Sequence, residues 1–185
     1  MSGYPSPSSV QLYLDDLAVG QRFESGIYSL DEAQIRRFAE EFDPQPFHLS
    51  AETAAGTFFD GLAASGFHTA AITMRLIVSS LPIAGGVIGA GCEIKWPRPT
   101  RPGDALKVEI EIVEIEPSMS RPHRGIVKVQ ATTINQNREP VQILQVMIVV
   151  PRRRGNARAG HLDQEFREPI RSSGRATGRL VTKST

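Results

Sequence analysis

A long apolar segment, residues 61–80, most constrains the fold of this chain. It contains one charged residue, Arg75, and a helix drawn over residues 63–78 has apolar side chains on almost every side. Such a helix must be enclosed by other elements. The segment also contains Gly66, His68 and several hydroxyl residues, so it makes a poor membrane span. We therefore expect a buried helix.

Strand-like segments that can enclose this helix follow it in the chain. Their ranges are residues 88–96, 106–112, 124–134 and 141–150. Apolar residues alternate with less apolar ones in the first two, which is typical of strands with one buried face. This alternation predicts that Cys92 is a small core residue. The pattern changes phase at Ile112 and Val113, which predicts a β-bulge or a sharp bend.

The order of these segments predicts an α+β domain. A short strand at residues 22–28 precedes the helices, and four strands joined as an antiparallel meander follow them. A sheet of about five strands with one apolar helix to cover is expected to curl around that helix.

A carboxylate and an imidazole stand five residues apart at Asp43 and His48. A helix with a capping box at Ser29 and Glu32 should end at Asp43, because Pro44 follows. The negative end of the helix dipole there predicts a raised pKa for Asp43.

The prolines in the segment from Asp43 to His48 predict a stiff, non-helical loop. If the two side chains converge, a carboxylate and a neutral imidazole can share a proton-transfer role near neutral pH. The alternative is a helix-ending loop in which Asp43 and His48 only satisfy backbone groups.

Composition excludes several classes of protein. The 185 residues are 40% hydrophobic and 22% charged, with a net charge of +1, which is ordinary for a globular protein and gives no signal for nucleic acid or membrane binding. The N-terminus lacks the pattern of a secretory signal. With Cys92 as its single cysteine, the chain can form no internal disulfide, so we expect a cytoplasmic protein. The cysteine and histidines show no metal-ligand spacing, so no metal is expected.

Three regions are expected along the chain. Residues 1–10 form an N-terminal tail and residues 11–151 form the domain. Residues 152–185 are basic and poor in apolar side chains, which predicts a mobile extension.

Residues 12–151 resemble the hotdog fold and, within it, the MaoC-like dehydratases, which include the (R)-specific enoyl-CoA hydratases. The family's hydratase motif stands here as Asp43-Pro44-Gln45-Pro46-Phe47-His48, with Gln45 where the family usually has Asn. Ser65-Gly66 stands at the start of the apolar helix, where the family commonly has His-Gly. The corner at residues 98–104, ending in Pro102-Gly103-Asp104, is also typical of the family and is structural in meaning.

The resemblance implies a reversible hydration of 2-enoyl-CoA thioesters to 3-hydroxyacyl-CoA. Asp43 and His48 would be the catalytic pair and would hold one water, and the Gly66 N–H would bind the thioester carbonyl, with Ser65 beside it at the substrate. A free amide at a helix N-terminus is independently suited to an enolate oxygen. The other interpretation of Gly66 is tight helix packing, and both can hold together.

The resemblance further implies a homodimer or higher homo-oligomer and no cofactor besides the coenzyme A of the substrate. Basic candidates for the coenzyme A phosphates are Arg75, Arg98 and Arg101. The sequence does not separate Asp43 from His48 as the principal base, and it does not reveal the acyl chain.

The chain departs from the family at several positions. Met74 stands where some hydratases have a serine near the pair, and Ser50 stands where an aspartate is common. His68 stands two residues after Gly66, and we expect its side chain to pack in the core or to support the site residues.

Two other functions stay open at this point. A hotdog thioesterase would use a carboxylate on the central helix, and residues 61–80 contain no Asp or Glu. A non-catalytic acyl-CoA-binding domain would not need the Asp43/His48 pair.

Overall fold

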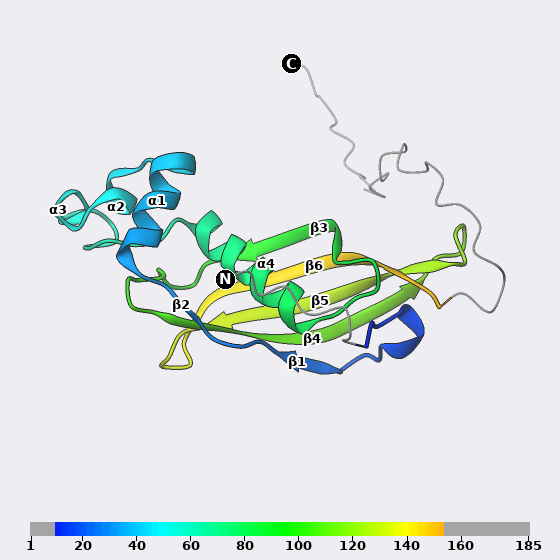
Figure 1. Cartoon of the computed structure of the whole chain (residues 1–185). Helices are drawn as coiled ribbons and strands as arrows, with labels where there is room; N and C mark the ends of the chain where they lie inside the picture. Colours follow the sequence, from blue (N-terminus) through cyan, green and yellow to red (C-terminus); the bar gives the residue numbers. More distant parts are fainter. Residues whose placement is uncertain (1–9, 154–185) are drawn as a thin grey trace, which may run out of the picture. The chain divides into compact units, whose positions relative to one another are not determined.

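The computed structural model describes residues 10–153 of the chain (Figure 1). Its elements in chain order are η1 (Leu14–Asp16), β1 (Arg22–Glu24), β2 (Tyr28–Ser29), α1 (Glu32–Phe42), α2 (Pro46–Leu49), α3 (Ala51–Ala54), α4 (Gly66–Ser80), β3 (Ile88–Lys95), β4 (Ala105–Pro117), β5 (Arg124–Ile134) and β6 (Pro140–Pro151). The expected tails fall almost entirely outside the described residues, so the domain boundaries stay a prediction.

One antiparallel sheet carries the domain, with the strand order β1-β4-β5-β6-β3 and the short β2 also paired with β4. The predicted α+β class is confirmed, and β4, β5 and β6 form the expected meander. The prediction that β3 joins that meander beside β4 is wrong, because β3 pairs with β6 at the opposite edge. The connection through residues 96–104 is too long and too rich in proline for a tight hairpin.

The helix α4 lies across one face of this sheet (Figure 1). The inward side chains of β4, which are Leu106, Val108, Ile110 and Ile112, are each at most 1% exposed. They share the hydrophobic core with Ile72, Leu76 and Ile77 of α4. The alternation read from the sequence in β4 is therefore confirmed, and so is the bulge, since the β4–β5 register shifts between Ile112 and Glu114.

The sheet covers only one side of α4. Four apolar residues at helical spacing stay exposed on its other side and are called the α4 stripe: Phe67, Ala71, Met74 and Val78. The expectation that this chain encloses the helix on all sides is wrong for the described residues, because a single sheet can contact only one side of a helix.

The edge strand β3 is also poorly covered. Most of its residues are exposed, and Cys92 is a free, exposed thiol. The prediction of Cys92 as a core residue is wrong, because an edge strand has one sheet neighbour and α4 does not cover this part of β3.

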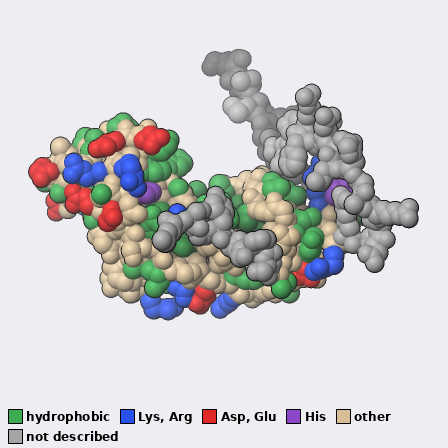
Figure 2. Space-filling view, viewed as in Figure 1, with side chains coloured by type: hydrophobic (Ala, Val, Ile, Leu, Met, Phe, Trp, Pro, Cys, Tyr) green, Lys and Arg blue, Asp and Glu red, His purple; other side chains and the backbone are tan. Residues whose placement is uncertain are grey.

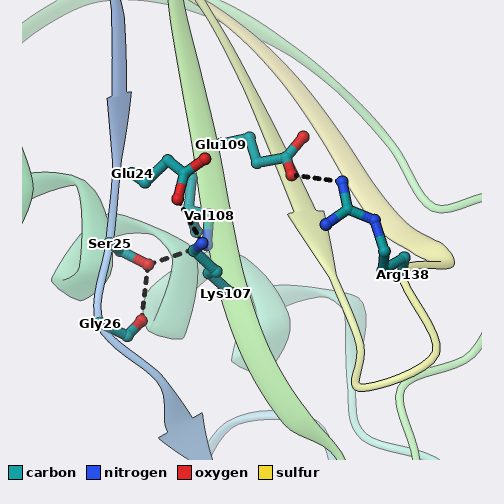
Figure 3. Close-up of polar contacts among 7 residues, drawn as sticks. All are labelled: Glu24, Ser25, Gly26, Lys107, Val108, Glu109 and Arg138. Carbon is teal, nitrogen blue, oxygen red and sulfur yellow. Dashed lines mark hydrogen bonds and ion pairs between the residues drawn. The ribbon is translucent and has the colours of Figure 1, made fainter.

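The predicted strand at residues 22–28 is divided into β1 and β2, both paired with β4. Where the chain bends between them, the Ser25 hydroxyl accepts the Val108 N–H at 2.8 Å and donates to the Gly26 carbonyl at 2.7 Å (Figure 3). The side chain thus replaces a backbone partner at the break. The Lys107–Glu24 pair stands beside it on the same strands.

The helices α1 to α3 gather at one end of the sheet (Figure 1). The α1 capping box uses Asp31 and Gln34 in place of the predicted Ser29 and Glu32, because Ser29 is paired with β4 in β2. Ser50 is the N-cap of the short helix α3, and its side chain accepts the Thr53 N–H. No helix within residues 10–153 is long and apolar enough to span a bilayer.

In Figure 2, charged side chains gather on the end of the domain formed by α1 to α3 and along the lower edge of the view. The described surface visible between these two regions is mainly hydrophobic or uncharged.

Candidate active site

Asp43 stands at the C-terminal cap of α1. Its N–H donates to the Ala39 carbonyl at 2.9 Å, and its own backbone is no longer helical, with φ −152° and ψ 68°. Pro44 follows and prevents a further helical turn. The predicted helix end is therefore confirmed, and the Asp43 side chain leaves α1 at this point.

The chain turns back at once to bring His48 to Asp43. The prediction of a wholly non-helical segment is wrong, because Pro46 is the first residue of α2. A proline suits that position since the first N–H of a helix has no intrahelical acceptor. The turn places Nε2 of His48 3.5 Å from Oδ2 of Asp43.

The orientation of the His48 ring is fixed by a backbone carbonyl. Its Nδ1 lies 2.7 Å from the Ala63 oxygen, and His48 is only 4% exposed. A carbonyl oxygen can only accept, so Nδ1 carries the hydrogen. The rings of Phe47 and Phe59 lie against the imidazole, at centroid distances of 4.6 and 6.0 Å. A neutral His48 therefore presents the lone pair of Nε2 to Asp43.

The Asp43 carboxylate has donors of its own. The Gln45 side-chain amide donates to Oδ1 at 2.7 Å. Partial burial acts to raise the pKa of Asp43, but hydrogen bonds from Ser65 and Gln45 and the neighbouring His48 outweigh it, so the pKa is lowered from 3.8. The predicted increase is wrong, because these donors act directly on the carboxylate. Asp43 is thus an anion at neutral pH.

Two acceptors consequently face each other across 3.5 Å when His48 is neutral. Neither can donate to the other, so the pair suits a molecule that offers O–H donors to both. A water molecule, which carries two O–H groups, has this property. The same two groups can each accept a proton.

Ser65 and Gly66 lie next to this pair at the start of α4. Ser65 is the N-cap, is 1% exposed, and accepts the Phe67 N–H at 3.2 Å. Its hydroxyl lies close enough to Asp43 to lower the pKa of that carboxylate. Gly66 is the first residue of the helix, and its N–H makes no hydrogen bond among the described residues. The four residues predicted from sequence are therefore brought together by α1, α2 and the N-terminus of α4.

Sequence reasoning missed the contribution of Trp96. A Cβ placed on Gly66 would lie 2.8, 3.0 and 3.1 Å from three atoms of the Trp96 indole. The indole N–H donates to Oε1 of the buried Gln142 at 2.8 Å, which holds the ring there. The glycine pointed to close packing, but nothing local in the sequence indicated the partner.

Arg101 is not free to bind a phosphate. Its guanidinium donates to three backbone carbonyls of residues 59–62, at 2.5 to 3.1 Å. Arg98 is half exposed and forms an ion pair with Glu139 at 3.5 Å. Arg75 lies 5.7 Å from the centre of the Tyr28 ring.

His68 packs in the core, as expected. Its ring stacks on Phe38 with centroids 4.5 Å apart. Burial lowers the pKa of His68, and Arg37 lowers it further. Its Nδ1 has no hydrogen-bond partner among the described residues. Within residues 10–153, no cluster of three or more His, Cys, Asp or Glu side chains is arranged to hold a metal ion.

Comparison with known proteins places the chain in a family. A family model described as the MaoC like domain matches residues 17–135, a range that contains Asp43, His48, Ser65 and Gly66. The chain belongs to the MaoC-like dehydratase family. The resemblance read from the sequence is confirmed.

Three relatives illustrate the match. The solved MaoC-like dehydratase of Rhodospirillum rubrum is 58% identical, with a TM-score of 0.76 over 77% of this chain and 99% of that one. The uncharacterized protein YdeM of Bacillus subtilis is 32% identical over 142 residues, covering 75% of this chain and 99% of that protein. A 3-hydroxybutyryl-CoA dehydratase of Methylorubrum extorquens is 32% identical over 111 residues, covering 60% of this chain and 69% of that protein. The predicted hotdog fold is confirmed by the match to the Rhodospirillum rubrum structure.

Proposed function

We propose that the protein catalyses the reversible hydration of a 2-enoyl-CoA thioester to the 3-hydroxyacyl-CoA. The observation that carries the proposal is the pair of facing acceptors, Asp43 Oδ2 and His48 Nε2, 3.5 Å apart beside the first amide of α4. The family is one of hydratases and dehydratases, and a relative named as a 3-hydroxybutyryl-CoA dehydratase supports a coenzyme A thioester as substrate.

In the proposed reaction, the pair holds a water molecule whose oxygen attacks C3 of the enoyl group. One proton of the water passes to the pair, with Asp43 as the principal base because it is ionised at neutral pH. The electrons of the C2=C3 double bond move toward the thioester carbonyl and form an enolate. The pair then returns a proton to C2, so that H and OH have been added and the reverse sequence is dehydration.

His48 orients the water and shares its proton in this mechanism. The Nδ1 hydrogen of a neutral His48 is directed to Ala63 and is not available to the substrate. The proton delivered to C2 is therefore the one that the pair took from water. This keeps the site in the same protonation state before and after each turnover.

Gly66 is the proposed donor to the enolate oxygen. A backbone N–H at a helix N-terminus combines a free donor with the positive end of the dipole, and a donor of this kind favours charge that develops in the transition state. Ser65 borders the substrate from the same turn. The chemistry requires no cofactor besides the coenzyme A of the substrate, and Arg75 and Arg98 stay candidates for its phosphates.

We further propose a homodimer or a higher homo-oligomer. The α4 stripe leaves Phe67 68% exposed, and the neighbouring edge strand β3 has one open side. Light scattering should give at least twice the mass of one chain, and Met74→Glu in the stripe should lower that mass. Met119→Glu, at a 95% exposed position in the β4–β5 turn, is the control. A wild-type monomer at micromolar concentration would contradict the proposal.

Hydration of crotonyl-CoA tests the proposed activity. The loss of enoyl-thioester absorbance and the release of free thiol should be followed in parallel. We expect the absorbance to fall with no thiol release. Thiol release would instead indicate a thioesterase, and binding of crotonyl-CoA with neither reaction would indicate a non-catalytic domain.

A further inference from the structure

We propose that Arg101 is a positioning residue for the hydration site, which keeps His48 in the tautomer that the reaction needs. This inference rests on the proposed function. From the sequence, the corner at residues 98–104 is structural in meaning, yet its arginine binds the segment that leads directly to the Ala63 carbonyl.

The guanidinium of Arg101 binds three carbonyls of a single segment. Nη1 donates to the Gly61 oxygen at 2.8 Å and to the Leu62 oxygen at 3.1 Å, and Nη2 donates to the Phe59 oxygen at 2.5 Å. A planar, permanently charged fork suits several acceptors at fixed angles. The compact ammonium of a lysine does not reproduce this geometry.

Ala63 follows this segment directly and joins it to His48. The Ala63 N–H donates to the Phe47 carbonyl at 3.1 Å, while its oxygen accepts from Nδ1 of His48 at 2.7 Å. The next N–H, that of Ala64, donates to the Thr100 carbonyl at 2.9 Å. Residues 59–64 are therefore bound by the corner on one side and by α2 on the other.

The segment needs this external support. Asp60 adopts φ 45° and Gly61 φ 136°, and the first of these is a left-handed conformation that non-glycine residues seldom adopt. Arg101 is itself fixed, because its N–H donates to Oδ2 of the buried Asp104 at 2.7 Å. The corner is thus a rigid base for a segment with an unfavourable backbone.

The chemical consequence concerns the hydrogen on the imidazole. With the Ala63 carbonyl in place, Nδ1 carries the hydrogen and Nε2 is an acceptor opposite Asp43. If the carbonyl moves, the hydrogen can transfer to Nε2, which then donates to the carboxylate. That state removes the acceptor for water, so catalysis should suffer more than substrate binding.

The test compares Arg101→Lys with Arg22→Lys, a matched change at an exposed ion pair on β1. ¹⁵N NMR of the imidazole, in the free protein, reports which nitrogen of His48 carries hydrogen. We expect wild type and Arg22→Lys to show hydrogen on Nδ1 only, and Arg101→Lys to show a mixture. Its kcat for crotonyl-CoA should fall about 10–100-fold, the scale of a small misplacement, with KM within about threefold.

Arg101→Ala provides a second route. Added methylguanidinium should restore part of its activity and the single tautomer. A single Nδ1–H tautomer with wild-type kcat in Arg101→Lys would overturn the proposal. Unfolding of both variants, even with methylguanidinium present, would also overturn it and assign Arg101 to stability alone. The NMR result does not depend on substrate, so it is separate from a failure of the proposed hydration.

Discussion

The contact between Gly66 and Trp96 allows a quantitative prediction for Gly66→Ala. The added methyl would lie 2.8 Å from one indole atom, which is closer than real Cβ contacts come, and 3.0 and 3.1 Å from two others. Overpacking of this kind typically costs about 1–3 kcal/mol. The indole also donates a hydrogen bond to the fully buried Gln142, so a shift of the ring away from the methyl would weaken this bond. Leaving a buried polar group unpaired costs a similar amount, about 1–3 kcal/mol. The free energy of unfolding should therefore fall by about 1–3 kcal/mol.

A double-mutant cycle with Trp96→Ala isolates this effect. Urea denaturation of wild type, both single variants and the double variant gives the coupling energy. In the Trp96→Ala background the added methyl has room, so Gly66→Ala should cost less than about 0.5 kcal/mol, the usual scale without a specific clash. An equal cost in both backgrounds would refute the assignment of Trp96 as the contact that requires glycine.

The same background separates packing from chemistry at Gly66. In wild type, alanine and proline both introduce a Cβ that contacts Trp96, so neither is a clean control. With Trp96→Ala, alanine keeps the N–H whereas proline removes it, and proline suits the first helical position. If both variants are folded, proline should lose about 3–4 kcal/mol of transition-state stabilisation relative to alanine. Equal activity would mean that another group binds the enolate oxygen.

Two further predictions concern titration. Gln45→Leu removes a hydrogen bond that lowers the pKa of Asp43. Ionised Asp43 stabilises the fold at pH values above its unfolded-state pKa of 3.8. This stabilisation is lost as the pH falls through the lower pKa of the folded state. In the pH profile of kcat/KM, the acid limb assigned to Asp43 should move to higher pH in Gln45→Leu. An unchanged limb would argue that the Gln45 hydrogen bond does not lower the pKa of Asp43. The pKa of His68 is lowered in the folded protein, so neutral His68 favours the fold at pH values above its unfolded-state pKa of 6.5. This stabilisation is lost as the pH falls through the lower pKa of the folded state. His68→Phe, which keeps a ring against Phe38, should weaken the loss of thermal stability between neutral pH and pH 5, and an identical loss in both proteins would contradict this.

Local patterns predicted the elements that depend on local physics. The strict alternation of Leu106, Val108 and Ile110 required one buried face, and the apolar sequence of α4 required burial of the helix, which the sheet provides on one side only. The proposed catalytic pair was found because Asp43 ends a helix and His48 follows five residues later.

Features that depend on distant partners were not predictable in the same way. The exposure of Cys92 follows from the pairing of β3 with β6, which no local pattern specifies. The pKa of Asp43 depends on Ser65, which stands on another element. The contact of Trp96 with Gly66 depends on where the end of β3 meets the start of α4. Resemblance supplied the proposed role of Gly66, whereas only the structure identifies its packing partner Trp96.

The central claim is that Asp43 and His48 together activate water, and its most direct test is crotonyl-CoA hydration by Asp43→Asn and His48→Ala. Glu41→Gln on the same helix and His123→Ala on the surface are matched controls. Each catalytic variant should fold and should lose about 10²–10⁴-fold in kcat/KM, the scale of a positioned acid or base, while both controls stay near wild type. Turnover by folded Asp43→Asn and His48→Ala within a few-fold of wild type would contradict the account.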